Sequence, residues 1–187
     1  IVFRDIARST DARTAILSLI PFYGVGHTAP IEFISKPICL SISLFANQNS
    51  IIFDYITRQK IGGTHLTFYI VKQLPVRPPD VYTPALVDLI APRVIELTYT
   101  AYDLDGFAGD VLEEIGPAAW DRWYPANPLR DGRPVPFRWD EARRARLRAT
   151  PPRRCVAPGP GNSLCGRSMA VGPFIERFGR PSRRLAV

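Results

Sequence analysis

The sequence lacks the residue patterns that most enzyme active sites require. It contains only two histidines, His27 and His65, and neither has a cysteine or an acidic residue at metal-ligand spacing. It has no Walker A loop, no HExxH motif and no GxSxG elbow. The Gly-x-Gly at 24–26 lacks the third glycine and the following helix of a dinucleotide site. An independent small enzyme is therefore the least favoured interpretation.

Cysteine is also scarce and unpaired. The three cysteines, Cys39, Cys155 and Cys165, form no CxxC pair, so we expect free thiols in the reducing cytoplasm. The uncharged run at 37–53 contains four polar residues at 47–50, which favours a buried helix over a membrane span. The chain shows no signal peptide and opens on Ile-Val-Phe without a methionine, so we expect a fragment of a longer protein.

The positive charge is unevenly distributed along the chain. Residues 1–79 carry eight basic and four acidic side chains, residues 80–150 carry nine and twelve, and residues 151–187 carry seven and one. The net charge of +7 therefore comes mainly from the end of the chain. The first segment is mildly basic, which suits a polyanionic partner, and the second is acidic.

The pattern of apolar residues predicts an α+β fold. We expect strands at 1–7 and 65–76 and two strands within 15–34, on either side of a loop at 24–28. A single long helix is predicted at 37–59, and a small mixed or antiparallel sheet should pack on it. Its apolar face is expected to contain Ile38, Ile42, Phe45, Ile52 and Ile56.

The second part of the chain has the pattern of helical spacer segments. Residues 77–84 form an expected linker, and Thr83 followed by Pro84 is a typical helix start. Pro92 is expected to divide this region into two helices. Residues 105–139 hold all three tryptophans and are expected to form loops with local helix, and a charged helix is expected at 138–149. The expected units are a core at 1–79, a spacer region at 80–149 and a disordered tail at 150–187.

Polar and basic residues of the first segment are the candidate contact groups. Guanidinium and ammonium groups bind phosphate, and side chains with hydrogen-bonding groups can read base edges. The alternative is that Arg58 and Lys60 only stabilise the helix, because positive side chains near a helix C-terminus interact favourably with the helix dipole. The candidate DNA-binding set is Arg4, Arg8, Arg13, His27, Thr28, Arg58, Lys60, Thr64 and His65.

Four stretches resemble a known family. They are "FRDIARSTDARTAILSLIP", "GVGHTAP", "LFANQNSIIFDYITRQKIGGTHLTFYIVKQLPV" and "RVIELTYTAYDL". Together they are similar to the target-recognition region of large adenine-specific DNA methyltransferases, the fused modification proteins of type II restriction–modification and phage-exclusion systems. The helix and the "KQLPV" strand also resemble one repeat of type I specificity subunits. The resemblance covers about residues 1–145.

The resemblance implies a role in DNA sequence recognition. The family's catalytic core has an Asn-Pro-Pro-Tyr loop and a glycine-rich S-adenosylmethionine motif, and this chain contains neither. The chain is therefore not expected to methylate DNA alone or to bind a cofactor, although the parent enzyme needs S-adenosylmethionine. The expected partners are double-stranded DNA and a methyltransferase catalytic domain, with no membrane. The alternative is a structural module that docks a methyltransferase subunit without touching DNA.

The end of the chain departs from the family pattern. After "FRWDEARRARLRA" the family continues with an acidic-apolar helix, whereas this sequence reads "TPPRRCVAPGPG". We expect this Arg/Pro/Gly-rich segment to be translated out of frame. The alternative is a basic arm that binds DNA phosphates without sequence preference.

Overall fold

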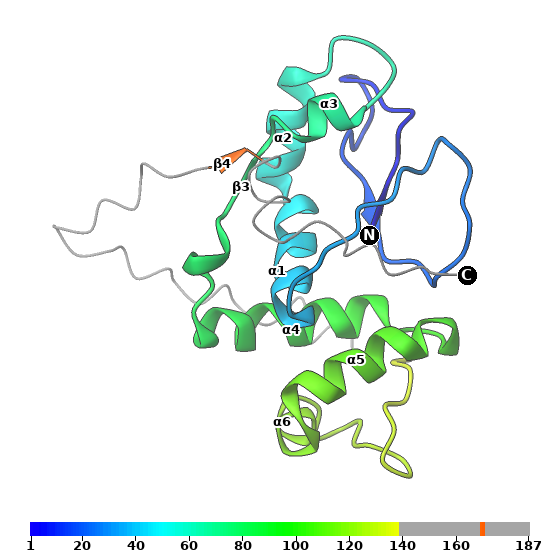
Figure 1. The fold of residues 1–187 in the computed structure, drawn as a ribbon, viewed down its shortest axis with the longest axis vertical. Helices are drawn as coiled ribbons and strands as arrows, with labels where there is room; N and C mark the ends of the chain where they lie inside the picture. Colours follow the sequence, from blue (N-terminus) through cyan, green and yellow to red (C-terminus); the bar gives the residue numbers. More distant parts are fainter. Residues whose placement is uncertain (139–168, 171–187) are drawn as a thin grey trace, which may run out of the picture.

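The computed structural model describes residues 1–138 and 169–170, and these form an α+β fold. A central helix runs between two groups of elements (Figure 1). The helices are α1 (Ile38–Gln48), α2 (Ile51–Lys60), α3 (Phe68–Val71), α4 (Pro84–Thr98), α5 (Asp105–Ile115) and α6 (Pro117–Trp123), with short 3-10 turns at Pro79–Val81 and Tyr102–Leu104. The central helix is α1, with α2 and α3 towards one end of the molecule and α4, α5 and α6 towards the other.

The strands are short and antiparallel. β1 (Val2–Phe3) pairs with β2 (Leu17–Ser18), so that Phe3 lies opposite Leu17. β3 (Pro75–Val76) pairs with β4 (Met169–Ala170) in a second two-stranded sheet. The strand expected at 1–7 and the first of the two expected within 15–34 are present over two residues each. The second is reduced to an isolated bridge between Val2 and Ile31.

The single helix predicted at 37–59 is wrong, because the structure divides it into α1 and α2. The Ser50 side chain accepts a hydrogen bond from the Phe53 amide at 3.2 Å, which is a typical N-cap that starts a new helix. Because of this division, the apolar face of α1 does not continue into α2 as predicted. Phe45 is buried as expected, with 7% of its surface exposed, but Ile52 is 69% exposed.

The strand predicted at 65–76 is also wrong over most of its length. Residues Phe68–Val71 form the short helix α3, and only Pro75–Val76 is strand. Leu66, Val71 and Leu74 are buried along this segment. Burial of these residues against the core outweighs the β propensity of the aromatic and β-branched side chains between them.

Helix α4 starts as the sequence predicts but does not break at Pro92. The Thr83 side chain accepts a hydrogen bond from the Leu86 amide at 3.4 Å, and Pro84 is the first helical residue. Pro92 lies inside the helix, and its carbonyl accepts a hydrogen bond from the Tyr124 hydroxyl at 2.8 Å. The neighbouring Ala91 is fully buried, so packing holds the helix together across the bond that proline cannot make.

A single cluster of buried side chains joins the two ends of the molecule. It includes Phe3 and Ile42 from the first segment and Ile95 and Trp120 from the second. Within the described residues no helix has the length and apolar character needed to cross a membrane. The helix expected at 138–149 and the tail expected at 150–187 lie almost entirely outside the described residues.

Candidate functional site

The structure brings the predicted contact segments together around residues 4–8. The Asp5 amide donates to the Thr28 carbonyl, and the Ala7 amide donates to the Thr64 carbonyl, each at 3.0 Å. The Leu66 amide returns a bond to the Asp5 carbonyl at 2.6 Å, and Ile6 forms a β-bridge with His65. The loops at 27–28 and 64–65, which are distant in the sequence, therefore both border the segment that carries Arg4 and Arg8.

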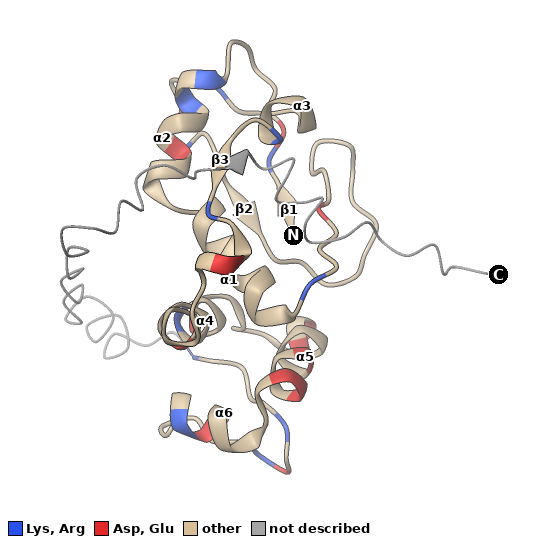
Figure 2. Cartoon of the chain, turned by 60° about the vertical axis from the view of Figure 1, so that its left-hand side comes forward, with Lys and Arg blue, Asp and Glu red and all other residues tan. Residues whose placement is uncertain are grey.

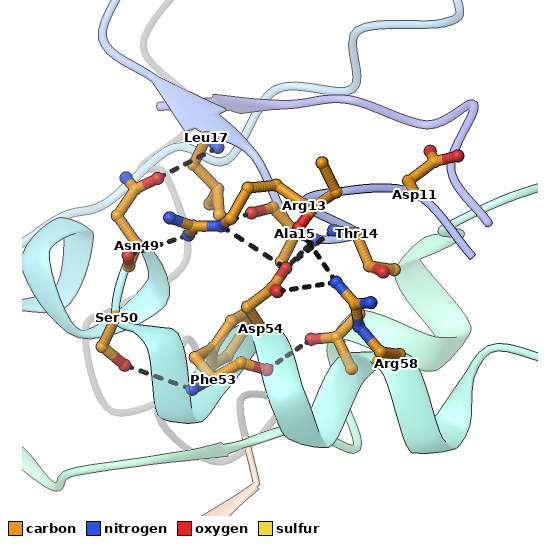
Figure 3. A network of polar contacts seen from close by, with 12 residues as sticks. Asp11, Arg13, Thr14, Ala15, Leu17, Asn49, Ser50, Phe53, Asp54 and Arg58 are labelled. Atoms are coloured by element: carbon orange, nitrogen blue, oxygen red, sulfur yellow. Dashed lines mark hydrogen bonds and ion pairs between the residues drawn. The ribbon is translucent and has the colours of Figure 1, made fainter. Parts of the chain in front are cut away.

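The carboxylate of Asp54 on α2 organises the adjacent loop (Figure 3). Asp54 is 4% exposed. Its Oδ1 accepts hydrogen bonds from the backbone amides of Thr14 at 2.8 Å and Ala15 at 2.7 Å. Two cations complete its surroundings, with Arg13 Nε at 3.6 Å from Oδ1 and Arg58 Nη2 at 3.4 Å from Oδ2.

These contacts determine the protonation of Asp54. Burial alone would raise the pKa of a carboxyl group, because it disfavours the charged form. Hydrogen bonds from the Ala15 and Thr14 amides and the charges of Arg13 and Arg58 act in the opposite direction, and they hold the pKa of Asp54 below its ordinary value. Asp54 is therefore a stable anion that fastens residues 13–15 to α2.

Three of the predicted arginines are engaged in this framework. Arg4 pairs with Asp11 at 2.9 Å and donates to the Arg13 carbonyl at 2.6 Å. Arg13 donates to the Asn49 carbonyl at 3.0 Å, and Arg58 donates to the Ala12 carbonyl at 3.1 Å. Their geometry suits the positioning of residues 8–15. A role in contacting DNA directly remains a prediction for these three.

Arg8 differs from these three because its backbone is fixed while its side chain is exposed. The Arg8 amide donates to Asp11 Oδ2 at 3.2 Å, and its carbonyl accepts a hydrogen bond from the Thr14 hydroxyl at 2.9 Å. Lys60, the last residue of α2, is also exposed. Within residues 1–138 and 169–170, neither side chain makes an ion pair or hydrogen bond of its own. Both cations are free to meet an anionic ligand.

The remaining predicted residues lie on the surface of the two loops. His27, Thr28 and Thr64 are exposed. The His65 imidazole lies 2.9 Å from the Asp5 carboxylate through Nδ1, with 59% of its side chain exposed. This contact leaves the other ring nitrogen, Nε2, available to an external partner.

Sequence reasoning missed the acidic partners of the arginines. Asp54 lies four residues before Arg58, the spacing at which an acid and a base meet on a helix. It also lies in the first turn after the N-cap Ser50, where acidic residues are favourable. The predicted continuous helix concealed only the second signal, because it placed Ser50 and Asp54 in a helix interior. The contact between Arg4 and Asp11 depends on the fold of a loop and has no comparable signal.

The last turn of α2 is basic, whereas α5 is acidic. Arg58 and Lys60 lie in the last turn of α2, whereas α5 carries acidic residues and no basic ones. Figure 2 shows these positions at well-separated parts of the molecule. The basic end of α2 and the acidic residues of α5 are therefore separated in space.

The described residues offer little for covalent or metal chemistry. Burial raises the pKa of the Cys39 thiol to about 12, with Glu114 adding to the shift, so this thiol stays protonated. No group of three or more His, Cys, Asp or Glu side chains in the described part of the chain is arranged to hold a metal ion. Comparisons with known proteins add no assignment, since no family model, curated protein or solved structure matches the chain.

Proposed function

We propose that this chain recognises DNA for an adenine-specific methyltransferase whose catalytic core is not part of it. The supporting observation is the fixed backbone and free side chain of Arg8, bordered by the loops of His27–Thr28 and Thr64–His65. A contact group on a fixed backbone loses less conformational entropy on binding than one on a mobile loop, which favours a recognition surface. The resemblance of the sequence supplies the methyltransferase context.

The proposed contacts divide into two kinds. Arg8 and Lys60 bind phosphates, which fixes the position of the duplex but conveys no sequence information. The hydroxyl and imidazole groups at 27–28 and 64–65 are placed to meet base edges. Arg4, Arg13 and Arg58 act as positioning residues, because each already holds a carboxylate or carbonyl of the loop. S-adenosylmethionine would bind the separate catalytic core, so this chain alone should not transfer a methyl group.

The test is a salt titration of duplex DNA binding by the 187-residue chain. Each phosphate contact contributes about −0.9 to the slope of log K against log salt. Arg8→Ala and Lys60→Ala should each make the slope less negative by about that amount. Arg133→Ala is the matched control, since Arg133 is an exposed arginine beyond α6 and should leave the slope unchanged.

All variants share the arginine-rich end of the chain, so its contribution to the salt slope cancels when the variants are compared. Equal slopes for Arg8→Ala, Lys60→Ala and the unmodified chain would contradict the proposal. Equal losses for these variants and Arg133→Ala would show a general attraction of charge without a defined face.

A second candidate is a docking module for a methyltransferase subunit. Three neighbouring apolar residues of α2 are largely exposed, namely Ile51 at 78%, Ile52 at 69% and Tyr55 at 64%. Exposed apolar patches of this kind mark protein interfaces. Tyr55→Ser together with Ile52→Ser should then weaken binding to a methyltransferase core while leaving the DNA salt slope unchanged. Loss of DNA binding in this variant would assign the patch to the DNA face instead.

A further inference from the structure

A pocket of about 830 Å³ lies at the start of α1, and none of the residues proposed to meet DNA is in its lining. Its walls come from residues 19–24, residues 31–38 and the face of α5 that carries Phe107. This volume lies in the usual range for small-molecule sites. The pocket is distinct from the segments at 4–8 and 64–65, none of which line it.

Aromatic side chains form much of the wall. Phe22 and Tyr23 are 91% and 72% exposed, and Phe33 is 54% exposed. Phe107 from α5 is partly buried against the core. Aromatic rings at a pocket mouth provide apolar contact area, and their faces also attract cations.

Carboxylates line the α5 side of the pocket. Asp110 and Glu113 are both exposed, and within the described residues neither makes an ion pair or hydrogen bond. Glu114 has a separate role, because its carboxylate accepts hydrogen bonds from the Ile38 and Cys39 amides at the start of α1. The basic groups of the lining are Lys36, which already has an interaction of its own, and the Ile1 ammonium, which donates to the Glu32 carbonyl at 3.2 Å.

A further carboxyl group lies beneath the apolar wall. Glu32 lines the pocket and is 4% exposed, and Gln48 Nε2 donates to its Oε2 at 2.9 Å. Its Oε1 has no hydrogen-bond partner within the described residues. An unsatisfied buried acceptor is costly, so a donor supplied by a ligand would be favourable here once the side chain turns toward it.

We propose that this pocket binds a small organic cation, an ammonium group attached to an apolar body. The aromatic wall accommodates the apolar body, and the unpaired carboxylates of Asp110 and Glu113 attract the ammonium. Buried Glu32 adds to the same lining a carboxyl oxygen that is unsatisfied within the described residues. This combination of aromatic faces and carboxylates favours cations over neutral or anionic molecules of the same shape.

The test uses three probes that share one apolar body and differ in charge. They are 3-phenylpropylammonium, 3-phenylpropanol and 3-phenylpropanoate, titrated into the full chain and followed by amide NMR shifts. The ammonium should shift the signals of residues 19–24, 31–38 and 107–114. It should bind about threefold to tenfold more tightly than the alcohol, and the carboxylate should bind least.

Variants test whether Asp110 and Glu113 cause the preference for the ammonium over the alcohol. Asp110→Asn combined with Glu113→Gln should remove most of the difference between the ammonium and the alcohol while retaining binding of the alcohol. Asp103→Asn is the matched control, because Asp103 is an exposed acid near α5 that does not line the pocket. This control should retain the full preference for the ammonium.

Several outcomes would overturn the proposal. Equal binding of the three probes would show an apolar pocket without charge selection, and absence of shifts at the lining residues would show that no such ligand binds. An equal loss in Asp103→Asn would assign the preference to the overall field. A peptide with lysine between aromatic residues that binds more than tenfold tighter than the ammonium would replace the small ligand with a protein segment.

Discussion

The two ends of the molecule are held together by different physical means. Around α2 and residues 4–15, the chain has little regular structure, and a buried carboxylate with backbone amides and arginines gives the loop its shape. Around α4–α6, packed rings replace this network, with the Trp120 and Tyr124 rings 4.9 Å apart and those of Tyr124 and Phe137 4.7 Å apart.

The difference indicates where recognition can occur. A loop whose backbone is fixed by hydrogen bonds can hold an exposed side chain such as Arg8 in a defined place. The groups that fix the backbone lie inside, and the exposed side chains lie outside. An aromatic cluster stabilises the fold by excluding water. Its side chains are buried against one another and are therefore not available to contact a ligand. We therefore propose DNA contact at the first end, and we expect the aromatic cluster at the second end to give structural support.

The largest expected effect is the loss of the aromatic cluster. Trp120 is fully buried, so Trp120→Ala should lower the free energy of unfolding by about 3–5 kcal/mol. Urea denaturation followed by circular dichroism measures this change. Tyr102→Ala, at a ring that is 68% exposed, is the control and should cost less than about 0.5 kcal/mol. Similar costs for both would mean that Trp120 does not support the second end.

The corresponding change at the first end is Asp54→Ala. It leaves the Thr14 and Ala15 amides without their acceptor and Arg13 and Arg58 without their anion, so we expect a cost of about 2–4 kcal/mol. The pKa of Asp54 is lowered by folding, so its contribution is present above the ordinary value of 3.8 and is lost as the pH falls through the folded value.

Asp54→Asn separates charge from shape in this comparison. It should reduce the acid sensitivity of unfolding while retaining part of the hydrogen bonding. Asp11→Ala, at a partly exposed acid that pairs with Arg4, should cost about 1 kcal/mol or less. An Asp54→Ala variant as stable as Asp11→Ala would contradict the central position of Asp54.

A smaller effect of opposite sign is expected at Glu32. Burial raises the pKa of Glu32 by more than the Gln48 hydrogen bond lowers it. Stability should therefore decline as the pH rises from the ordinary value of 4.5 through the raised folded value, since the folded state retains the proton longer. Glu32→Gln should flatten this decline, measured as unfolding free energy against pH. Glu113→Gln, at an exposed acid, should leave it unchanged.

The smallest effect is expected on the exposed face of α2. Ile52 is 69% exposed, so Ile52→Ala should change the free energy of unfolding by less than about 0.5 kcal/mol. A cost of 2 kcal/mol or more in the isolated chain would show that this face is covered, and thermal unfolding is sufficient to detect it.

The sequence predicts the class of fold and several element boundaries correctly, for local reasons. The α+β class, the strand at the start of the chain and the Thr83–Pro84 helix start all follow from side-chain pattern and capping. The segment containing Phe68–Val71 was predicted as strand, because its propensity favours strand and only tertiary burial reveals the helix. Pro92 was predicted to end a helix, but it lies inside α4, and its carbonyl accepts a hydrogen bond from the Tyr124 hydroxyl.

For the candidate site, sequence pattern identified the basic residues but not their partners. Arg8 and Lys60 are exposed, as the predicted surface requires. The roles of Arg4 and Arg13 depend on Asp11 and Asn49, which meet them only through the folding of the loop at 8–15. Arg58 meets Asp54 on the same helix, but its bond to the Ala12 carbonyl also needs that loop. Charge counts cannot distinguish an arginine that shapes a loop from one that faces a ligand.

The account is tested most directly by mapping the DNA contact on the full chain. Amide NMR spectra recorded with and without duplex DNA should show changes at 4–8, 27–28 and 60–65, and no changes along α4–α6. Arg8→Ala should reduce these changes, and Arg133→Ala should not. Changes confined to residues 84–138, or an undisturbed first segment at a DNA concentration that saturates binding, would contradict the assignment of this face to DNA.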